Sequence, residues 1–557
     1  MGFFKKTNPR RDQVRKNIGT GKAWSSMPVD ADVVTSVLIW LVYVVLCIAI
    51  ISFEFVRSGR FKAILPTATI VLLLSVAVAV YIYHYQTRMI KNHARAIVLA
   101  SLFLILLGTT KLGVMSFSHE SWATSWATGT AVMAGMVLAI AYDQRFALGM
   151  GIFYGLYACL ALIRVDQPSY QLTQAFLLLT MISGVLTSGF CLREIRSRMK
   201  LLEVSALTAV VVFITATSVG FLSAMDQPGT ESGKIIWVAG CHAGFAFFVG
   251  VFVHSFLPLI EKLFRIATSM TLLDYSDANQ PLLKKLAMET PGTYSHSLLI
   301  GSISEAAAEA IGCNGLLCRV GAYYHDIGKM NKPGYFIENQ SGCASPHKEL
   351  SPTMSQLIIV GHVKDGIEMA KEYKLPAVIR QFIETHHGTT LIEPFYKEAV
   401  KKYESPTNGT PGQKPKEAPP SESEFRYAGP KPRTKEAAIL MIADGVEGAV
   451  RSMAEVTPSK VETVVHNMAM KRLQDGQFDE CDITLRELSR AEAGMAKALA
   501  AHYHGRIAYP TAPDDPDFVK PEKEKEKEKG KEKEKEKEKE RAAAVVSPGE
   551  HVDSGKS

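Results

Sequence analysis

Residues 36–53 read SVLIWLVYVVLCIAIISF, an apolar run without a single charged side chain. A helix needs about 20 mostly apolar residues to cross a bilayer, so this run predicts a transmembrane helix. A buried helix of a soluble protein is the alternative for one such run, but the pattern repeats along the chain. Similar runs lie near residues 63–83, 96–115, 121–142, 146–163, 171–192, 204–225 and 235–260. We therefore predict an all-α chain whose residues 36–260 form a membrane domain of about eight transmembrane helices.

The charges around these runs predict their orientation. The chain carries a formal net charge of +7, much of it in a basic arm at residues 1–35. Basic residues mark the cytoplasmic side of a span, and the connectors 85–95 and 193–200 are basic as well. Eight spans then leave both termini in the cytoplasm, although the basic connector 57–62 disagrees. No external connector exceeds about a dozen residues, so we expect no extracytoplasmic domain.

The overall composition excludes other classes of protein. Eight cysteines in 557 residues are too few for a disulfide framework, and a hydrophobic fraction of 47% excludes a wholly disordered chain. Because membrane topology explains the basic arm, we expect the lipid bilayer as a partner and no nucleic-acid polymer.

From Glu261 onward the sequence is typical of a soluble helical domain. We expect an amphipathic linker at residues 261–290 and a helical bundle at 291–508, with a surface loop at 404–423 that is rich in Pro, Gly and Lys. Residues 520–541 are almost pure Lys/Glu alternation, which puts like charges four residues apart and disfavours a helix. Residues 509–557 are therefore predicted to be a disordered Lys/Glu-rich tail.

Five histidines and two aspartates of the soluble part stand out. Each falls on a predicted helix or at its end, so a bundle can point them at one interior point. Imidazole and carboxylate ligands suit first-row transition metals, and seven ligands are more than one ion needs. Scattered core or surface histidines are the alternative, which the clustering disfavours. The predicted ligands are His296, His325, Asp326, His362, His386, His387 and Asp444.

At these residues the chain resembles a known family. HDIGK at 325–329 is the signature of HD-domain metal-dependent phosphohydrolases. The wider stretches resemble the seven-transmembrane HD phosphodiesterases, bacterial membrane enzymes that degrade cyclic di-AMP. These stretches are PGTYSHSLLIG at 291–301, GHVKDGIEMAKEYKLP at 361–376, IETHHGTTLIEPFY at 383–396 and FRYAGPKPRTKEAAILMIADGVEGAVRS at 425–452. The likeness covers residues 260–475 in sequence and the membrane part in architecture only. The family's extracytoplasmic domain has no counterpart in the short first loop.

The resemblance implies a cytoplasmic all-helical HD domain with two divalent metal ions, most often manganese or iron. One ion would be held by His296, His325, Asp326 and Asp444, and the other by Asp326, His362, His386 and His387. Asp326 would bridge the two ions. Asp326 and Lys329 are the predicted catalytic residues, because a lysine beside the metals can neutralise phosphate charge. Candidate substrate contacts are Lys329, Tyr294, Arg426 and Arg451.

The function implied is hydrolysis of cyclic di-AMP to linear pApA at the bacterial inner membrane, which would regulate the level of a second messenger. Relatives that cleave cyclic di-GMP carry Gly-Tyr-Pro soon after the His-His pair, whereas residues 388–396 read GTTLIEPFY here. A membrane receptor that binds a nucleotide without hydrolysing it is a second hypothesis, which the complete ligand set disfavours. A transporter is a third, but we expect Lys111 to have no charged partner in the spans. A homodimer or an unidentified sensory partner is left open.

Overall fold

The computed structural model describes residues 31–86, 93–117, 119–163, 171–192, 195, 197–225, 231–340, 345–404 and 419–504. Helices make up the regular structure of these residues, and their one isolated β-bridge pairs Leu391 with Arg426. The prediction of an all-α chain is confirmed. The chain divides into two units, residues 1–498 and 499–557, and only residues 499–504 of the second unit are described.

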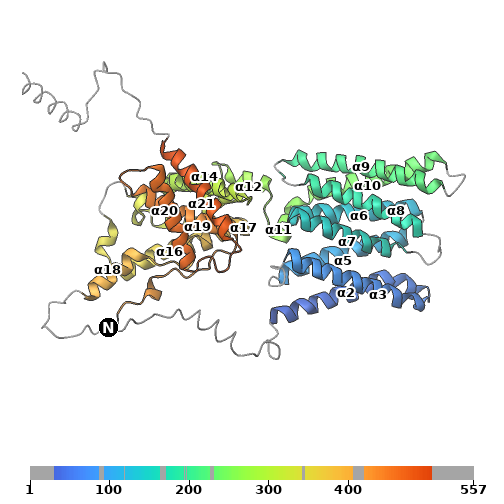
Figure 1. The fold of residues 1–557 in the computed structure, drawn as a ribbon, viewed down its shortest axis with the longest axis horizontal. Helices are drawn as coiled ribbons and strands as arrows, with labels where there is room; N and C mark the ends of the chain where they lie inside the picture. The colour runs from blue at the N-terminus through green and yellow to red at the C-terminus, as the bar shows by residue number, and fades with distance from the viewer. Residues whose placement is uncertain are drawn as a thin grey trace, which may run out of the picture. The chain divides into compact units, whose positions relative to one another are not determined.

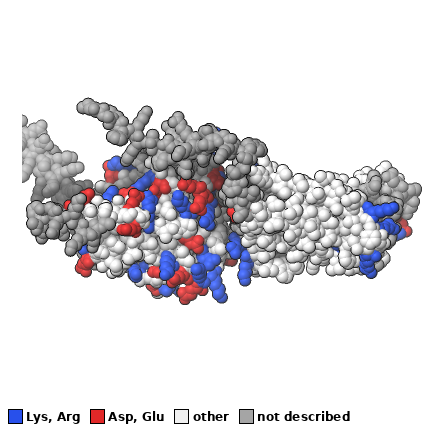
Figure 2. Space-filling model, turned by 90° about the horizontal axis from the view of Figure 1, so that it is seen from below, with Lys and Arg blue, Asp and Glu red and all other residues white. Residues whose placement is uncertain are grey.

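Eight long helices form the membrane part of the described chain, and they run side by side in Figure 1. They are α2 (Ala31–Arg57), α3 (Ile64–Tyr85), α5 (His93–Ser116), α6 (Glu120–Ala141), α7 (Gln144–Ala161), α8 (Gln171–Cys191), α9 (Arg198–Ala224) and α10 (Ser232–Ser255). Figure 2 shows charged side chains gathered over the soluble helices and sparse over these apolar ones. A polytopic membrane domain is therefore confirmed.

Seven of these helices, all except α7, are long and apolar enough to cross a membrane. Helix α7 differs because its first turn holds Gln144 and Arg145. It also lies inside the bundle, with Met150, Tyr154 and Tyr157 fully buried. A helix enclosed by other helices exposes little surface to lipid, so it needs less apolar character than its neighbours. The number of crossings stays a prediction.

Polar contacts inside the membrane part correct one prediction. The Lys111 ammonium of α5 donates to the Glu54 carboxylate of α2 over 2.8 Å and to the Ala161 carbonyl of α7 over 3.1 Å. Lys111 therefore has the charged partner that we did not expect. Glu54 lies just past the apolar run 36–53, and α2 continues to Arg57, which brings the carboxylate into the bundle. Elsewhere, His242 Nδ1 lies 2.8 Å from Thr128 Oγ1 and joins α10 to α6.

Three short helices lie where an amphipathic linker was predicted: α11 (Leu257–Phe264), α12 (Ser269–Ser276) and α13 (Pro281–Glu289). Helix α11 packs Ile260 and Phe264 into an apolar cluster with the membrane helices. By contrast, Leu272 of α12 and Leu282, Leu283 and Leu286 of α13 belong to the core of the soluble bundle. Part of the apolar surface of this segment is therefore buried within the fold, whereas Leu259 and Leu263 of α11 are exposed.

The soluble bundle contains α14 (Pro291–Ala310), α15 (Gly315–Tyr324), α16 (Pro352–Glu372), α17 (Ala377–Thr385), α18 (Glu393–Glu404), α19 (Lys435–Arg451), α20 (Pro458–Gln474) and α21 (Leu485–His504). Ser351 caps α16 by accepting a hydrogen bond from Met354 N over 3.2 Å, as its place before Pro352 predicts. Residues 1–30 of the basic arm, 405–418 of the predicted loop and the tail 509–557 lie outside the described residues.

Candidate metal centre

Five helices of the soluble bundle bring the predicted ligands together. His296 lies on α14, His362 on α16 and Asp444 on α19. The other four ligands come at helix ends: His325 and Asp326 follow α15, and His386 and His387 follow α17. At a helix end the chain turns, so two consecutive side chains can face the same interior point. All seven predicted ligands are therefore brought to one place.

A glycine explains why the segment after Asp326 lies so close to α16. A Cβ atom on Gly328 would lie 1.9 Å from the His362 carbonyl oxygen and 2.5 Å from Gly366 N, which no real side chain tolerates. The absence of a side chain lets the 3₁₀ turn η2 (Ile327–Asn331) pack directly on the backbone that carries His362. This contact sets the spacing between Asp326 and His362.

The ligands form two groups that meet at Asp326. One group is His362, His386 and His387, and the other is His296, His325, Asp326 and Asp444, with ligand atoms within 4.8 Å of one another in each. Asp326 Oδ1 faces the first group, 3.4 Å from His362 Nε2 and 3.5 Å from His386 Nε2. Asp326 Oδ2 faces the second, 3.1 Å from His325 Nε2 and 3.6 Å from His296 Nε2. One carboxylate thus has an oxygen on each side.

Hydrogen bonds fix the direction of several imidazole rings. His325 Nδ1 lies 2.6 Å from the Ala322 carbonyl, His362 Nδ1 lies 2.5 Å from that of Ile359, and His386 Nδ1 lies 2.9 Å from that of Ile383. A carbonyl only accepts, so each Nδ1 carries a hydrogen. The neutral form of each ring then has its lone pair on Nε2, the atom that faces the centre. This arrangement is typical of histidines that bind metals.

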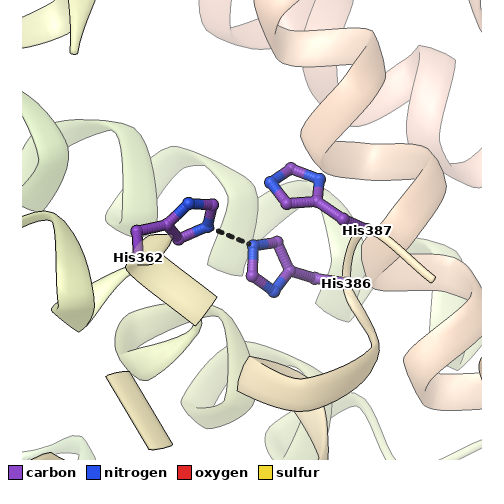
Figure 3. A group of neighbouring side chains, drawn as sticks. All are labelled: His362, His386 and His387. Atoms are coloured by element: carbon purple, nitrogen blue, oxygen red, sulfur yellow. Dashed lines mark hydrogen bonds between the residues drawn. The ribbon is translucent and has the colours of Figure 1, made fainter. Parts of the chain in front are cut away.

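Figure 3 shows His362, His386 and His387 pointing toward one another, with His362 Nε2 only 3.1 Å from His386 Nε2. Because both Nδ1 atoms donate to carbonyls, two neutral rings would put two lone pairs against each other. A cation between the rings removes this repulsion. The geometry of the three histidines therefore favours a bound metal ion over an ordinary hydrogen bond.

Burial lowers the pKa values of the histidines, whereas neighbouring carboxylates raise them, and the balance differs between His362 and His325. Burial lowers the pKa of His362 to about 3, so this ring stays neutral and keeps its lone pair. At His325 burial also disfavours charge, but the Asp326 carboxylate outweighs it and raises the pKa of His325 to about 10. Asp326 is buried too, yet the charges of His325 and Lys329 hold the pKa of its carboxyl well below the ordinary value. The centre thus holds its carboxylate ionised.

Unsatisfied atoms test whether these residues fit a metal. Among the described residues, Asp326 Oδ1, Asp326 Oδ2 and His325 Nε2 are buried and make no hydrogen bond, although the Lys329 ammonium forms an ion pair with Asp326 Oδ2. Leaving a buried polar atom unpaired costs about 1–3 kcal/mol. Coordination by a divalent ion satisfies such atoms, and nitrogen and carboxylate ligands suit first-row transition metals. The donor set fits divalent metal binding.

Lys329, the predicted phosphate contact, lies inside the centre. Its Nζ is 2.6 Å from Asp326 Oδ2 and 2.7 Å from Glu338 Oε1, and it lies over the Phe336 ring at 5.2 Å from the centroid. Glu338 also accepts from Thr293 Oγ1 over 3.2 Å. The lysine is therefore held beside the metal ligands by a second buried carboxylate, which the sequence did not single out.

The other predicted substrate contacts do not point into the centre. Tyr294 packs against the apolar core of the bundle. Arg426 binds Asp475 at 3.0 Å and Glu422, and donates to the Thr389 carbonyl over 2.8 Å, so it holds the segment after His387 in place. Arg451 faces Glu447, with 3.7 Å between Nη2 and Oε2. These contacts give Tyr294, Arg426 and Arg451 structural roles, and their contacts with a substrate stay predictions.

Besides Glu338, three residues that sequence reasoning missed lie at or beside the centre. Glu447 Oε2 is 2.7 Å from His296 Nδ1. The Tyr427 ring stacks on His387 with centroids 4.2 Å apart. Arg472 of α20 reaches the backbone beside Asp444, where a Cβ on Gly445 would lie 3.3 Å from Arg472 Nη2. For Glu447 the signal was its spacing, one helical turn after Asp444; Tyr427 and Arg472 come together with the ligands only through tertiary packing.

Comparison with known proteins identifies the family. A family model described as "7TM receptor with intracellular HD hydrolase" matches residues 61–268, and an HD domain model matches residues 293–449. The chain belongs to this seven-transmembrane HD family. Within the described residues, the first match contains seven long helices, α3 and α5–α10, so α7 is needed to complete the family's seven. The second match contains all seven predicted ligands of this seven-transmembrane HD protein.

Its curated relatives are longer. The chain is 42% identical over 337 residues to the cyclic-di-AMP phosphodiesterase PgpH of Bacillus subtilis (strain 168), covering 60% of this chain and 44% of the relative. It is 35% identical over 433 residues to PgpH of Listeria monocytogenes serotype 1/2a, covering 78% and 55%. The chain therefore spans about half the length of the curated relatives that it matches.

A crystal structure of the L. monocytogenes PgpH HD domain, also solved in complex with cyclic di-AMP, is similar to part of this chain. The sequence identity is 43%, the match covers 41% of this chain and 100% of that one, and the TM-score is 0.37.

Proposed function

We propose that this seven-transmembrane HD protein is a metal-dependent phosphodiesterase that hydrolyses cyclic di-AMP to linear pApA and thereby regulates the level of this second messenger. The observation that carries the proposal is the complete set of seven histidine and aspartate ligands, arranged in two groups on either side of Asp326. The substrate is supported by the relatives named cyclic-di-AMP phosphodiesterase at 42% and 35% identity.

Two divalent ions, manganese or iron, would supply positive charge at the scissile phosphate and lower the pKa of the attacking water. The side chains of the protein would hold these ions and orient the substrate. Asp326 offers one oxygen to each ligand group, and its pKa is held low, so it stays an ionised bridge. Glu338 holds the Lys329 ammonium in position, where its positive charge would face the phosphate. No serine or cysteine nucleophile is required.

The localisation that we propose is the bacterial inner membrane, with both termini and the HD domain in the cytoplasm. The basic connectors of the sequence and the family description of an intracellular HD hydrolase support this orientation. Cyclic dinucleotides are soluble, so a cytoplasmic HD domain would meet its substrate there.

A turnover assay on the full chain tests the proposal. The protein, purified in detergent and loaded with Mn²⁺ or Fe²⁺, should convert cyclic di-AMP to pApA and act much more slowly on cyclic di-GMP. Asp326→Ala should abolish turnover because it removes an oxygen from both ligand groups. A metal-loaded, folded protein that binds cyclic di-AMP without hydrolysing it would replace this proposal with a receptor. Faster turnover of cyclic di-GMP would assign the other substrate.

A further inference from the structure

The side chain of Arg472, on α20, lies beside the metal centre. Its Nε–H is buried and donates to no acceptor, and no hydrogen bond or ion pair of its guanidinium is found among the described residues. Arginine offers five N–H donors and stays charged at any physiological pH. A charged group removed from water without a partner costs free energy. Such a group is expected where a ligand supplies the missing acceptor.

Packing of α20 on α19 explains how Arg472 reaches this position. A Cβ on Gly445 would lie 2.9 Å from Met468 Sδ and 3.3 Å from Arg472 Nη2, so the bare backbone of Gly445 lets α20 approach closely. Gly445 directly follows Asp444. Burial lowers the pKa of Arg472, and the Asp444 and Asp475 carboxylates only partly oppose this effect. The Gly445 contact puts the guanidinium beside the backbone that carries a predicted metal ligand.

An aromatic ring completes this side of the centre. Tyr427 stacks on His387 with an interplanar angle of 28° and meets the His362 ring edge-on, with centroids 6.4 Å apart. Burial raises the pKa of the Tyr427 phenol, and the charges of Lys329 and Arg472 act in the opposite direction. Tyr427 and Asp444 both lie against His387. Arg472 lies beside the backbone next to Asp444, so these residues border one region at the edge of the metal ligands.

Other basic residues near the centre are already paired. Lys329 contacts Asp326 and Glu338, Arg426 contacts Asp475, and Arg451 faces Glu447. Lys431 donates to the Gly476 carbonyl over 2.8 Å. Arg472 differs from these four residues because it has its donors available. Among the described basic residues of this region, Arg472 is therefore the one best able to bind an additional anion.

We propose that Arg472 binds a phosphate of the nucleotide substrate, the one that is not being hydrolysed. This inference rests on the proposed function, since a cyclic dinucleotide carries two phosphodiesters and the metal centre with Lys329 takes one of them. Arg472 lies at the edge of the centre, beside Asp444, where the second phosphate of a bound substrate needs a counter-charge. A guanidinium recognises phosphate by two parallel hydrogen bonds, which an ammonium cannot match.

The test compares two substrates with the full, Mn²⁺-loaded chain in detergent. Cyclic di-AMP has two phosphates, whereas bis(p-nitrophenyl) phosphate has only the scissile one. Arg472→Met should raise the KM for cyclic di-AMP about 10- to 100-fold, the factor expected for losing a charge-assisted hydrogen bond. The ratio of kcat/KM between cyclic di-AMP and bis(p-nitrophenyl) phosphate should fall by a similar factor. Arg472→Lys should recover part of the loss.

Controls separate this role from a structural one. Arg433→Met removes an exposed arginine that pairs with Glu480 at 2.9 Å, and it should leave both substrates unaffected. Metal content should stay equal in all variants. Because Arg472 has no partner to lose, Arg472→Met should not lower the melting temperature of the substrate-free protein. An unchanged KM and an unchanged substrate ratio in Arg472→Met would overturn the inference, as would a loss of stability without a change in the ratio.

Failure of the proposed function can be told apart from failure of this inference. If the wild-type chain does not hydrolyse cyclic di-AMP, the dissociation constant of cyclic di-AMP, measured by equilibrium dialysis, takes the place of KM. A rise of about tenfold or more in Arg472→Met would still support the phosphate contact. Equal affinity in the two proteins, or no binding by either of them, would reject it.

Discussion

His296 Nδ1 lies 2.7 Å from Glu447 Oε2, and both side chains are buried. A carboxylate only accepts when ionised, so the imidazole carries its hydrogen on Nδ1 and presents Nε2 to Asp444 at 3.2 Å. Arg451, on the next turn of α19, stands 3.7 Å from the same Glu447 oxygen and partly balances its charge. This chain of contacts holds one metal ligand in the orientation that coordination requires.

Glu447→Ala should therefore weaken one metal site and leave the other intact. Loss of a carboxylate that orients a metal-bound histidine typically lowers metal affinity about 10- to 100-fold. Metal content after dialysis, measured by mass spectrometry, should fall from two ions per chain toward one. Glu447→Gln should lose less, because its amide oxygen still accepts the hydrogen bond. Glu462→Ala, on the exposed face of α20, is the matched control. Equal retention of both ions in Glu447→Ala and the control would contradict this role.

Metal binding should compete with protons at His325. Burial opposes its charge, but Asp326 and Asp444 raise the pKa of His325 to about 10, well above the ordinary histidine value of 6.5. The raised pKa stabilises the metal-free fold below pH 6.5, and this contribution is lost as pH rises through 10. A metal needs the Nε2 lone pair, so binding at neutral pH must release this proton.

Metal affinity should consequently increase with pH between 6 and 8.5, by about tenfold per pH unit for each proton released. Titration calorimetry in buffers of different ionisation enthalpy would count the protons directly. His362, whose pKa burial lowers to about 3, should contribute none in this range. A dissociation constant that does not change with pH would mean that His325 is already neutral in the metal-free protein.

The structure brings the seven predicted ligands together, and four of them belong to short local patterns. HDIGK and the His-His-Gly stretch place consecutive ligands at helix ends, and those ends lie where the sequence predicts them. Glu447, Tyr427 and Arg472 depend instead on how α19, α20 and the segment after His387 pack together. The substrate contacts Tyr294, Arg426 and Arg451 were chosen for residue type alone, and the structure gives their polar and aromatic groups to other partners.

Two helices of the predicted bundle differ in how clearly their sequences indicate a helix. Helix α18 is mostly polar and contains no buried residue, so its sequence carries little periodic signal. Helix α21 does carry one, since Leu488, Ala491 and Met495 recur at helical spacing and are all buried. The pairing of Glu54 with Lys111 could not be predicted from the apolar runs, because Glu54 lies outside the run that defines its helix.

Gly328→Ala should disturb the position of His362, the metal ligand on α16. The added methyl would meet the His362 carbonyl and Gly366 N, and backbone atoms cannot rotate away as a side chain can. Separation of η2 from α16 would move Asp326 away from His362, so we expect a loss of about 1–3 kcal/mol in stability and weaker metal binding.

The control is Gly361→Ala, next to His362 on the same helix. A Cβ there meets nothing within 4 Å, and alanine stabilises a helix interior by about 1 kcal/mol. Equal melting temperatures and metal contents in the two variants would contradict the close approach.

The ion pair between Glu54 and Lys111 should be a strong stabilising contact of the membrane part. The Lys111 side chain is only 4% exposed and that of Glu54 21%, so each charge depends on the other. Removing one partner of a buried pair typically costs about 3–5 kcal/mol, since it leaves an uncompensated charge. Glu54→Gln should therefore lower the melting temperature of the detergent-solubilised chain, and Glu54→Gln combined with Lys111→Met should restore much of it.

The exposed pair Lys200–Glu203, 3.4 Å apart on α9, provides the control, because Glu203→Gln should change stability by less than about 1 kcal/mol. If Glu54→Gln behaves like Glu203→Gln, then water or lipid headgroups already compensate Lys111, and α2 is held to α5 and α7 by apolar packing alone.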